Sequence, residues 1–563
     1  DNAGRDKPRP RGYAAAMPVT HEVFNQAGEP PAHDAFTGDA ALLEAVSAFG
    51  AGWAAPHLAA VGARIGSAEL RALAREANRN PPELAAFDRF GHRIDEVAFH
   101  PAWHRLMGMI RADRFHSLAW TEPRPGAHVA RAAVAYLWGQ GEPGVCCPAA
   151  MTFAATAALA HAPDLLARFR DRILAPGYDP RPLPPAEKPA LGVAMAMTEK
   201  QGGSDLRQTR TTATRAGDSW RLTGHKWFFS VPTSDLFLTL ARTGETISCF
   251  LAQGWRDDGS RNAVRIQRLK DKLGNRSNAS SEVEFDELEA VMVGAEGRGI
   301  ATIIEMAHLT RLECALGAAS LMRQATSLAL HHAAHRRAFQ RALIDQPLMR
   351  AVLADMALEA EAALWLALRA AAATDAAARN PAEAALARII VPVAKYWTCK
   401  RAPALLAEAL ECHGGNGFVE EHPIARLYRE APLNGVWEGA GNVICLDVLR
   451  ALTRTPEAAA ALAAELAPAR GADTALDALI AGVEAMLERP ESAEPVARRL
   501  VEHLALALSA ALLLRHAPAA VAERFIAARI VHPALAFGAA GATGGDADLL
   551  ARAAVIPDAC PNA

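Results

Sequence analysis

Apolar residues recur at helical spacing through most of the first 195 positions. The spacing is clearest in three Ala-rich segments, 42–46, 131–136 and 151–159. Apolar positions repeated every three or four residues predict helices with one buried face. We therefore predict a helical domain over residues 36–195. The residues before it, 1–35, begin with a polar stretch rich in Pro and Arg, which predicts a flexible tail.

The spacing changes to alternation between residues 196 and 295. Short runs of apolar and polar residues alternate there and are separated by Gly, Asp and Asn, which predicts strands of a small β domain. The runs are 219–222, 236–240, 247–251, 264–268 and 282–285.

Helical spacing returns at residue 300 and continues beyond residue 450. Long Ala- and Leu-rich segments of this kind suit a helical bundle, which we place at 296–450. Residues 451–563 are predicted to form an extra helical domain. The fold class expected from these blocks is α+β, with a β domain between two helical ones.

Composition agrees with a globular protein of several domains. The chain has 563 residues, 51% hydrophobic content and a formal net charge of −3. The apolar run at 504–514 is too short to cross a bilayer, so no membrane anchor is expected. Eight cysteines show no paired metal-ligand spacing and no secretory signal is recognisable, which predicts no metal site, reduced thiols and a cytoplasmic location.

Residues 196–205 read Ala-Met-Thr-Glu-Lys-Gln-Gly-Gly-Ser-Asp. The glycine pair allows the backbone to approach a flat ligand, and Thr198 and Ser204 offer hydroxyls beside it. By itself, the segment is equally well interpreted as a Gly-Gly turn with a capping Ser.

A second motif occupies residues 411–430 and contains Gly414-Gly415-Asn416-Gly417. Glycine conformations let successive amides turn toward phosphate oxygens, although a lone glycine loop is weak support for a phosphate site. Trp437-Glu438-Gly439 follows it.

Together and in this order, the two motifs resemble signatures of the acyl-CoA dehydrogenase family. The resemblance runs from about residue 23 to about residue 450. Segments 224–232, 268–280 and 437–442 are most similar to a branch of the family that is linked to the response to DNA alkylation. The resemblance implies an N-terminal helical domain, a middle β-barrel, a C-terminal helical bundle and FAD as cofactor.

The family's cofactor contacts can be carried over position by position. Phe228 and Ser230 would share one face of a strand, which places a ring and a hydroxyl against the flavin; aromatic runs in strands more often belong to a core. The resemblance implies FAD-binding roles for Met195, Met197, Thr198, Gly203, Ser204, Phe228, Phe229, Ser230, Arg336, Phe339, Gln346, Gly414, Gly415, Gly417, Trp437, Gly439, Ala440, Gly441 and Asn442.

Arg336, Phe339 and Gln346 match family positions that reach the flavin of a neighbouring subunit. The resemblance therefore implies a homo-oligomer, and the expected assembly is a tetramer built from two dimers. Gln340 stands where the family usually has Gly, so the local loop can differ. The alternative is that Arg336 belongs to a solvated basic cluster with its neighbours.

Glu438 is the predicted catalytic residue. Oxidation of an acyl thioester to its enoyl form needs a base on one side of the Cα–Cβ bond and a hydride acceptor on the other. The Glu of this Glu-Gly pair is that base in the family, and its apolar surroundings would raise its pKa toward neutrality. A Glu in a generic position would be a solvated surface group.

Two departures from the family pattern affect the substrate side. Ala440 replaces a hydroxyl residue near the flavin, for which Asn442 could compensate. His308 stands three positions before Arg311, where ordinary members have an acidic residue at the mouth of the substrate site. Arg311 is the predicted substrate contact, but recognition of CoA is in doubt.

DNA binding is implied by the resemblance and not by charge. Residues 451–563 carry nine arginines and thirteen acidic residues, and no lysine follows Lys400. A local patch could still form, although a solvated helix surface is the simpler interpretation. The candidate contacts to double-stranded DNA are Arg450, Arg454, Arg498 and Arg499.

Three functions remain open from the sequence. The favoured one is an FAD-dependent dehydrogenase acting on an acyl thioester. The second is a flavoprotein that binds and protects DNA in the response to alkylating agents, with weak or vestigial dehydrogenase activity. The third is a structural remnant in which the flavin only stabilises the oligomer.

Overall fold

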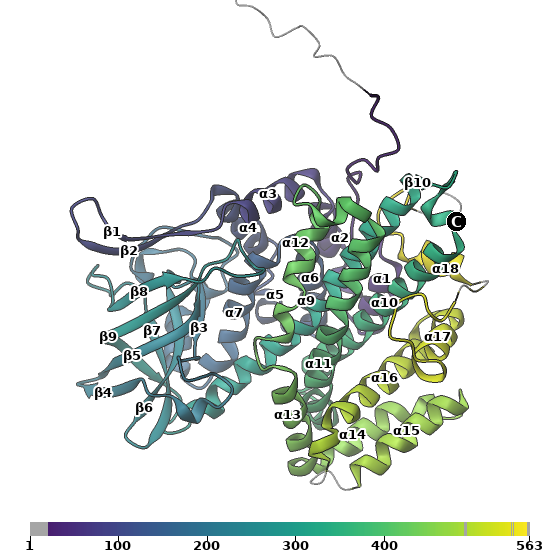
Figure 1. The fold of residues 1–563 in the computed structure, drawn as a ribbon. Coiled ribbons are helices and arrows are strands. Elements are labelled where there is room, and N and C mark those ends of the chain that lie inside the picture. The colour runs from purple at the N-terminus through teal and green to yellow at the C-terminus, as the bar shows by residue number, and fades with distance from the viewer. Residues whose placement is uncertain (1–20, 489–492, 542, 544, 560–563) are drawn as a thin grey trace, which may run out of the picture.

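The computed structural model describes residues 21–488, 493–541, 543 and 545–559. Figure 1 shows the β domain on one side, the longest helices in the middle and the C-terminal helices on the opposite side. This order confirms the predicted α+β architecture. Residues 1–20 of the predicted tail lie outside the described residues. Residues 21–35 are described, and Asn25 in this stretch donates a hydrogen bond from its side chain to the carbonyl of Arg337 at 2.9 Å.

The N-terminal domain is helical, as predicted, with one β-hairpin that the periodicity did not indicate. Two of its helices begin at residues whose side chains accept a backbone N–H, Asp39 from Leu42 and Ser67 from Leu70. Its elements are α1 (Ala40–Ala48), α2 (Ala55–Ile65), α3 (Ala68–Arg79), β1 (Glu83–Phe87), β2 (Arg93–Ala98), α4 (Pro101–Ala112), α5 (Leu118–Thr121), α6 (Ala127–Gly141), α7 (Pro143–Leu159) and α8 (Pro163–Ile173).

The middle domain is a closed β-barrel, and all five predicted runs lie within its strands. The order is β3-β6-β4-β5-β9-β7, and β7 also pairs with β6, which closes the barrel. The strands are β3 (Val193–Ala196), β4 (Thr212–Ala216), β5 (Ser219–Ser230), β6 (Leu236–Thr243), β7 (Thr246–Gln253), β8 (Val264–Leu269) and β9 (Ser280–Val293).

The central bundle is built on three long helices, α9, α10 and α11, that pack along one another. Helix α10 is buried over most of its length. Its elements are α9 (Gly299–His335), β10 (Arg337–Ala338), β11 (Arg341–Ala342), α10 (Pro347–Ala376), α11 (Pro381–Cys412), the 3-10 helix η5 (Gly414–Phe418), α12 (Pro423–Glu430) and α13 (Gly441–Arg454).

The C-terminal helices pack against the bundle through buried ion pairs. Arg529 pairs with Asp355 and Glu359 of α10, at 2.6 and 2.8 Å. Arg552 pairs with Glu361 of the same helix at 2.9 Å. The helices are α14 (Pro456–Leu466), α15 (Thr474–Leu487), α16 (Ala497–His516), α17 (Ala519–Ile526) and α18 (Asp546–Ala553).

Two further observations concern the described residues only. None of their helices combines the length and the apolar character needed to cross a membrane. Nor do they bring together three His, Cys, Asp or Glu side chains in an arrangement that could hold a metal ion.

Candidate active site

Glu438 lies in the loop between α12 and α13 and is held there from two helices. The hydroxyl of Thr310 on α9 donates to Oε2 of Glu438 at 2.8 Å, and Arg311 Nε donates to its backbone carbonyl at 3.0 Å. Lys395 of α11 donates to the carbonyl of Gly439. Glu438 has φ +57° and Gly439 has φ +109°, conformations that the surrounding contacts must stabilise.

The environment of Glu438 favours its protonated form. Burial raises the pKa of the carboxyl, and this effect outweighs the hydrogen bond from Thr310 and the charges of Arg311 and Lys395, which lower it. The side chain nevertheless keeps partial exposure. A carboxylate with these properties is suited to accept a proton from a bound ligand.

Arg311 does not have the free side chain expected of a substrate contact. It is 9% exposed, and Nη1 donates to Asp447 at 2.9 Å while Nε holds the Glu438 carbonyl. Asp447 also pairs with Arg388 at 2.8 Å. Arg311 therefore supports the Glu438 loop, and its predicted contact with a substrate stays a prediction. His308, one turn earlier, is kept neutral because burial lowers its pKa to about 4.

A cysteine that the sequence gave no reason to select lies between β5 and the Glu438 loop. Cys147 of α7 interacts with the Ser230 hydroxyl, and the Glu438 charge also acts on it. Burial raises the pKa of this thiol to about 12, so it remains protonated. Cys147 thus shows that Ser230 and Glu438, 208 residues apart in the sequence, border one region of the protein.

The alternation predicted for the end of β5 is present. The Phe228 side chain is 52% exposed, whereas Phe229 is fully buried and packs on Phe237 with ring centroids 4.9 Å apart. The Ser230 hydroxyl lies 3.3 Å from the hydroxyl of Ser280 on β9. Phe228 is therefore half exposed, with the ammonium of Lys270 4.7 Å from its ring centre. The ring of Phe229 belongs to the barrel core, and its predicted contact with a cofactor stays a prediction.

The first motif continues from β3 and lies beside this end of β5. Thr198 accepts a hydrogen bond from the backbone N–H of Trp227 at 2.8 Å through its carbonyl. A Cβ at Gly203 would stand 2.3 Å from Thr198 Oγ1, so this position requires glycine. Met195 and Met197 are half-buried against the barrel core, and Ser204 is exposed.

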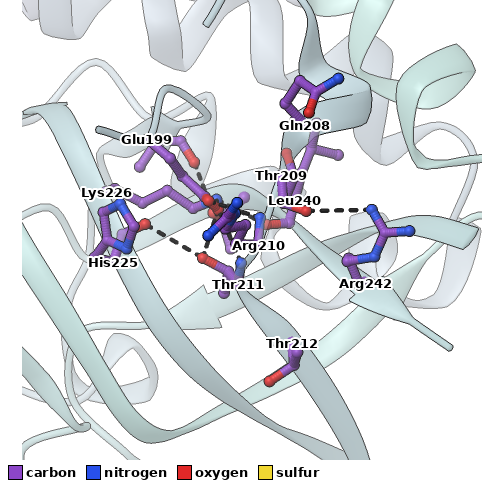
Figure 2. A network of polar contacts seen from close by, with 12 residues as sticks. Glu199, Gln208, Thr209, Arg210, Thr211, Thr212, His225, Lys226, Leu240 and Arg242 are labelled. Atoms are coloured by element: carbon purple, nitrogen blue, oxygen red, sulfur yellow. Dashed lines mark hydrogen bonds and ion pairs between the residues drawn. The ribbon is translucent and has the colours of Figure 1, made fainter. Parts of the chain in front are cut away.

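A buried ion pair anchors this motif inside the barrel, as Figure 2 shows. Lys226 Nζ donates to Glu199 Oε1 at 2.8 Å and to the Leu240 carbonyl at 2.9 Å. Glu199 also accepts from the backbone N–H groups of Arg210 and Thr211. Burial alone would raise the pKa of Glu199, but Lys226 and these hydrogen bonds lower it to about 2. The carboxylate is therefore charged and fixes the chain directly after Thr198.

Six of the predicted cofactor residues, in the Arg336 loop and the glycine loop, gather at the C-terminal end of α9. Arg336 donates to the Asn25 carbonyl, and Asn416 donates to Gln26 at 3.4 Å. The rings of His332 and His413 lie 4.7 Å apart. These contacts bring the Arg336 loop and the glycine loop together. Phe339 of the first loop is 89% exposed, Gln346 bonds to the Ala338 carbonyl, and Gly414 and Gly415 are exposed at the tip of the second, whereas Gly417 is buried.

Helix length separates these two groups of predicted cofactor residues. Thr310 and Arg336 are 26 positions apart, and α9 runs between them without a break. At 1.5 Å per residue this corresponds to roughly 39 Å along the helix axis. The Arg336 loop and the Glu438 loop of one chain are therefore at opposite ends of the bundle.

Residues after Glu438 form the exposed start of α13. Trp437 is half-buried and donates from Nε1 to Asn434 Oδ1 at 3.0 Å. Ala440 and Asn442 are exposed, and Gly441 packs against Lys400 and Tyr396. This short segment thus exposes two side chains next to Glu438 and carries no hydroxyl at Ala440.

The four arginines predicted to contact DNA lie on α13 and at the start of α16. All four are exposed. Arg450 is within 3.5 Å of Asp447, and Arg498 donates to the Tyr396 hydroxyl at 3.1 Å. Two of the four thus have intramolecular partners, and DNA binding stays a prediction.

Comparison with known proteins places the chain in a family. Residues 194–288 match the profile of the acyl-CoA dehydrogenase middle domain and residues 297–453 that of its C-terminal domain. The chain belongs to the acyl-CoA dehydrogenase family, whose members are oxidoreductases. Within that family, residues 25–180 match the N-terminal domain of the adaptive response protein AidB.

Three similar proteins extend over most of the chain. The putative acyl-CoA dehydrogenase AidB of Escherichia coli K12 is 46% identical over 509 residues, covering 90% of this chain and 93% of that protein. The crystal structure of Caenorhabditis elegans ACDH-11 in complex with C11-CoA has a TM-score of 0.82 and 26% identity, covering 97% of this chain and 95% of that one. The Bd2924 apo-form has a TM-score of 0.81 and 28% identity, covering 88% and 100%.

Proposed function

We propose that the protein is an FAD-dependent dehydrogenase that introduces a double bond between Cα and Cβ of an acyl thioester, with Glu438 as the base. The observation that carries this proposal is the carboxyl of Glu438, which burial primes for proton uptake and which the hydroxyl of Thr310 holds by a hydrogen bond of 2.8 Å. The binding of C11-CoA by the related C. elegans protein supports an acyl-CoA ligand.

The residues around Phe228 fit a flat aromatic cofactor such as flavin. Phe228 presents a ring that is half exposed, although large aromatic side chains are usually buried. Gly203 keeps the adjacent backbone free of a Cβ, and Ser230 has a hydroxyl on the same face of the strand as Phe228. Thr198 and Met197 would line the edge of the ring system.

In this proposal the protein controls the proton. FAD, when bound, supplies an acceptor for the hydride that leaves Cβ. Glu438 would take the proton from Cα, and the pair of electrons left there would form the second bond of the Cα–Cβ double bond as the hydride leaves Cβ. Thr310 fixes one carboxylate oxygen and thereby orients the other toward the substrate. Burial excludes water that would compete for the proton.

The direct test is an anaerobic titration of the FAD-loaded protein with saturated acyl-CoA thioesters from C4 to C16. We expect loss of the flavin absorbance near 450 nm with at least one chain length, because hydride transfer reduces the flavin. The matching enoyl-CoA should appear in equal amount. A protein that binds FAD fully but is not reduced by any of these thioesters would contradict the proposal.

The cofactor is proposed to be shared between subunits of a homo-oligomer, with a tetramer as the expected assembly. The separation along α9 supports this. Arg336 lies roughly 39 Å along the helix axis from Thr310, which holds Glu438, so the Arg336 loop does not serve the Glu438 site of its own chain. It would instead reach the FAD of a neighbouring chain. Each site is then incomplete in the isolated subunit.

Arg336→Ala is expected to lower both FAD retention and the oligomer mass. The guanidinium would otherwise pair with the cofactor's phosphates, a charge-assisted contact that is stronger than a neutral hydrogen bond. Flavin content per chain and mass by light scattering measure the two effects together. Arg341→Ala, an exposed arginine on β11, is the matched control. If Arg336→Ala leaves both quantities unchanged, the cofactor is not shared in this way.

A further inference from the structure

A large cavity that Glu438 does not line lies between the N-terminal helices and the barrel. It has a volume of about 780 Å³ and is bordered by α3, by the loop between β8 and β9, and by α12 (Figure 1). Its volume falls within the range of small-molecule sites, roughly 300–1,000 Å³. Neither Glu438 nor Phe228 lines it.

Two rows of cationic side chains face each other across this cavity. Helix α3 contributes one arginine on each successive turn, and the loop between β8 and β9 contributes the opposing row. The rows consist of Arg71, Arg75 and Arg79 on the helix and of Lys270, Lys272 and Arg276 on the loop.

Most of these cations lack a carboxylate partner in the part of the chain that the structure describes. Lys270 pairs with Glu282, and Arg71 lies 4.0 Å from Glu29. By contrast, Arg79, Lys272 and Arg276 donate hydrogen bonds to backbone carbonyls. Arg79 donates to Glu420 O at 3.4 Å, Lys272 to Asn278 O at 2.5 Å and Arg276 to Lys272 O at 3.3 Å. Four acidic residues, Glu29, Asp271, Glu420 and Glu421, also line the cavity, but the cations outnumber them, and a bound anion would reduce the repulsion among the cations.

Two buried amides on the wall of the cavity also lack partners. Asn278 is 1% exposed, and apart from the weak thiol of Cys147 neither atom of its amide group has a hydrogen-bond partner. Gln140 is 3% exposed, and its Nε2 is without an acceptor. Buried polar groups are almost always paired, so these amides indicate a ligand that supplies the missing contacts.

We propose that this cavity is a binding site for a small phosphate-bearing ligand, recognised by Arg75, Arg79 and Lys272 and by the amides of Gln140 and Asn278. The fork of arginine donors matches phosphate oxygens, and two rows of cations suit a diphosphate better than a single phosphate. This site borders the one proposed for FAD, because Lys270 on its wall lies 4.7 Å from the centre of the Phe228 ring, but it is a distinct site and does not depend on the dehydrogenase proposal.

The protonation of Lys272 adds a signature to this site. Burial lowers the pKa of Lys272 to about 8, an effect that is opposed by Cys147, Glu430 and Asp271. A bound anion stabilises the ammonium and raises that pKa. The ligand therefore binds best where Lys272 is already charged, and affinity is expected to fall as the pH rises from 7 through 8 to 9.

Calorimetric titration of the FAD-loaded protein with pyrophosphate and with ADP tests the proposal. We expect saturable binding of at least one probe at one site per chain, weakened at least tenfold in the double variant Arg75→Ala/Arg79→Ala. Arg215→Ala, an exposed arginine on β4 that does not line the cavity, is the control and should bind as the wild type does. The affinity in Lys272→Met should lose its dependence on pH between 7 and 9.

Three results would overturn the proposal. The first is the absence of binding of either probe to the FAD-loaded protein. The second is binding that appears only when FAD has been removed, since the phosphate site would then be the cofactor's own. The third is displacement of pyrophosphate by a single-stranded oligonucleotide of higher affinity, which would assign the cavity to nucleic acid. Flavin content and thioester reduction of Arg75→Ala/Arg79→Ala are measured in parallel and should match the wild type.

Discussion

Replacing Glu438 by Gln is expected to slow reduction of the bound flavin by an acyl thioester by at least about a hundredfold, the usual range for loss of a general base being 10²–10⁴. Gln has almost the same shape as Glu but cannot accept the Cα proton. The flavin content should stay that of the wild type because Gln can still accept the hydrogen bond from Thr310. Stopped-flow absorbance under anaerobic conditions measures the rate.

The pH dependence separates a loss of the base from a loss of packing. Only the carboxylate form of Glu438 accepts a proton, so the wild-type rate should rise with pH through the raised pKa of that group and level off above it. Glu438→Gln should show no such rise. Thr310→Val removes a hydrogen bond that lowers the pKa of Glu438, so the inflection should move to higher pH. A Glu438→Gln protein that is reduced at the wild-type rate would exclude Glu438 as the base.

Lys226→Met is expected to lower the free energy of unfolding by about 3–5 kcal/mol, the cost of leaving a buried charge without its partner. Glu199 is 1% exposed and would lose its counter-charge inside the barrel. Because Glu199 directly follows Thr198, the segment beside Phe228 should shift as well. We therefore expect a lower thermal unfolding midpoint together with weaker FAD retention, measured by calorimetry and by flavin release.

The paired variant Glu199→Gln/Lys226→Met tests the reason for this effect. Replacing both charged groups removes the uncompensated charge, so most of the lost stability should return. Lys200→Met, at an exposed neighbouring position, is the control for a general loss of positive charge. If the paired variant is less stable than Lys226→Met alone, the unpaired Glu199 charge is not the cause of the destabilisation.

Local pattern was sufficient to predict the domain order and the strands of the barrel. Alternation is a property of neighbouring residues, so the opposite directions of Phe228 and Phe229 followed from the strand itself. The cofactor assignment of Phe229 came from motif matching, which does not distinguish a side chain that faces a ligand from the one behind it. The β1–β2 hairpin was not predicted because its two strands are short, lie within a helical domain and show little alternation of apolar and polar residues in the sequence.

The contacts that define Glu438 could not be predicted from the sequence. Thr310 and Lys395 occupy ordinary positions on long helices, and only the packing of α9 and α11 turns them toward the Glu438 loop. The sequence also showed no sign that the guanidinium of Arg311 donates a hydrogen bond to Asp447, because Asp447 lies 136 positions later. Motifs locate the backbone of a site, whereas its electrostatics depend on residues far away in the chain.

The ion pairs of α10 bear on the order in which the protein can be completed during synthesis. The carboxylates of Asp355, Glu359 and Glu361 are buried, and arginines that pair with them lie at 529 and 552, nearly 200 positions further on. Until residues 529 and 552 have left the ribosome, the acidic groups of α10 are without these partners. The bundle therefore reaches its final packing only after residues 529 and 552 have been synthesised, and removing them would weaken the bundle instead of detaching a separable module.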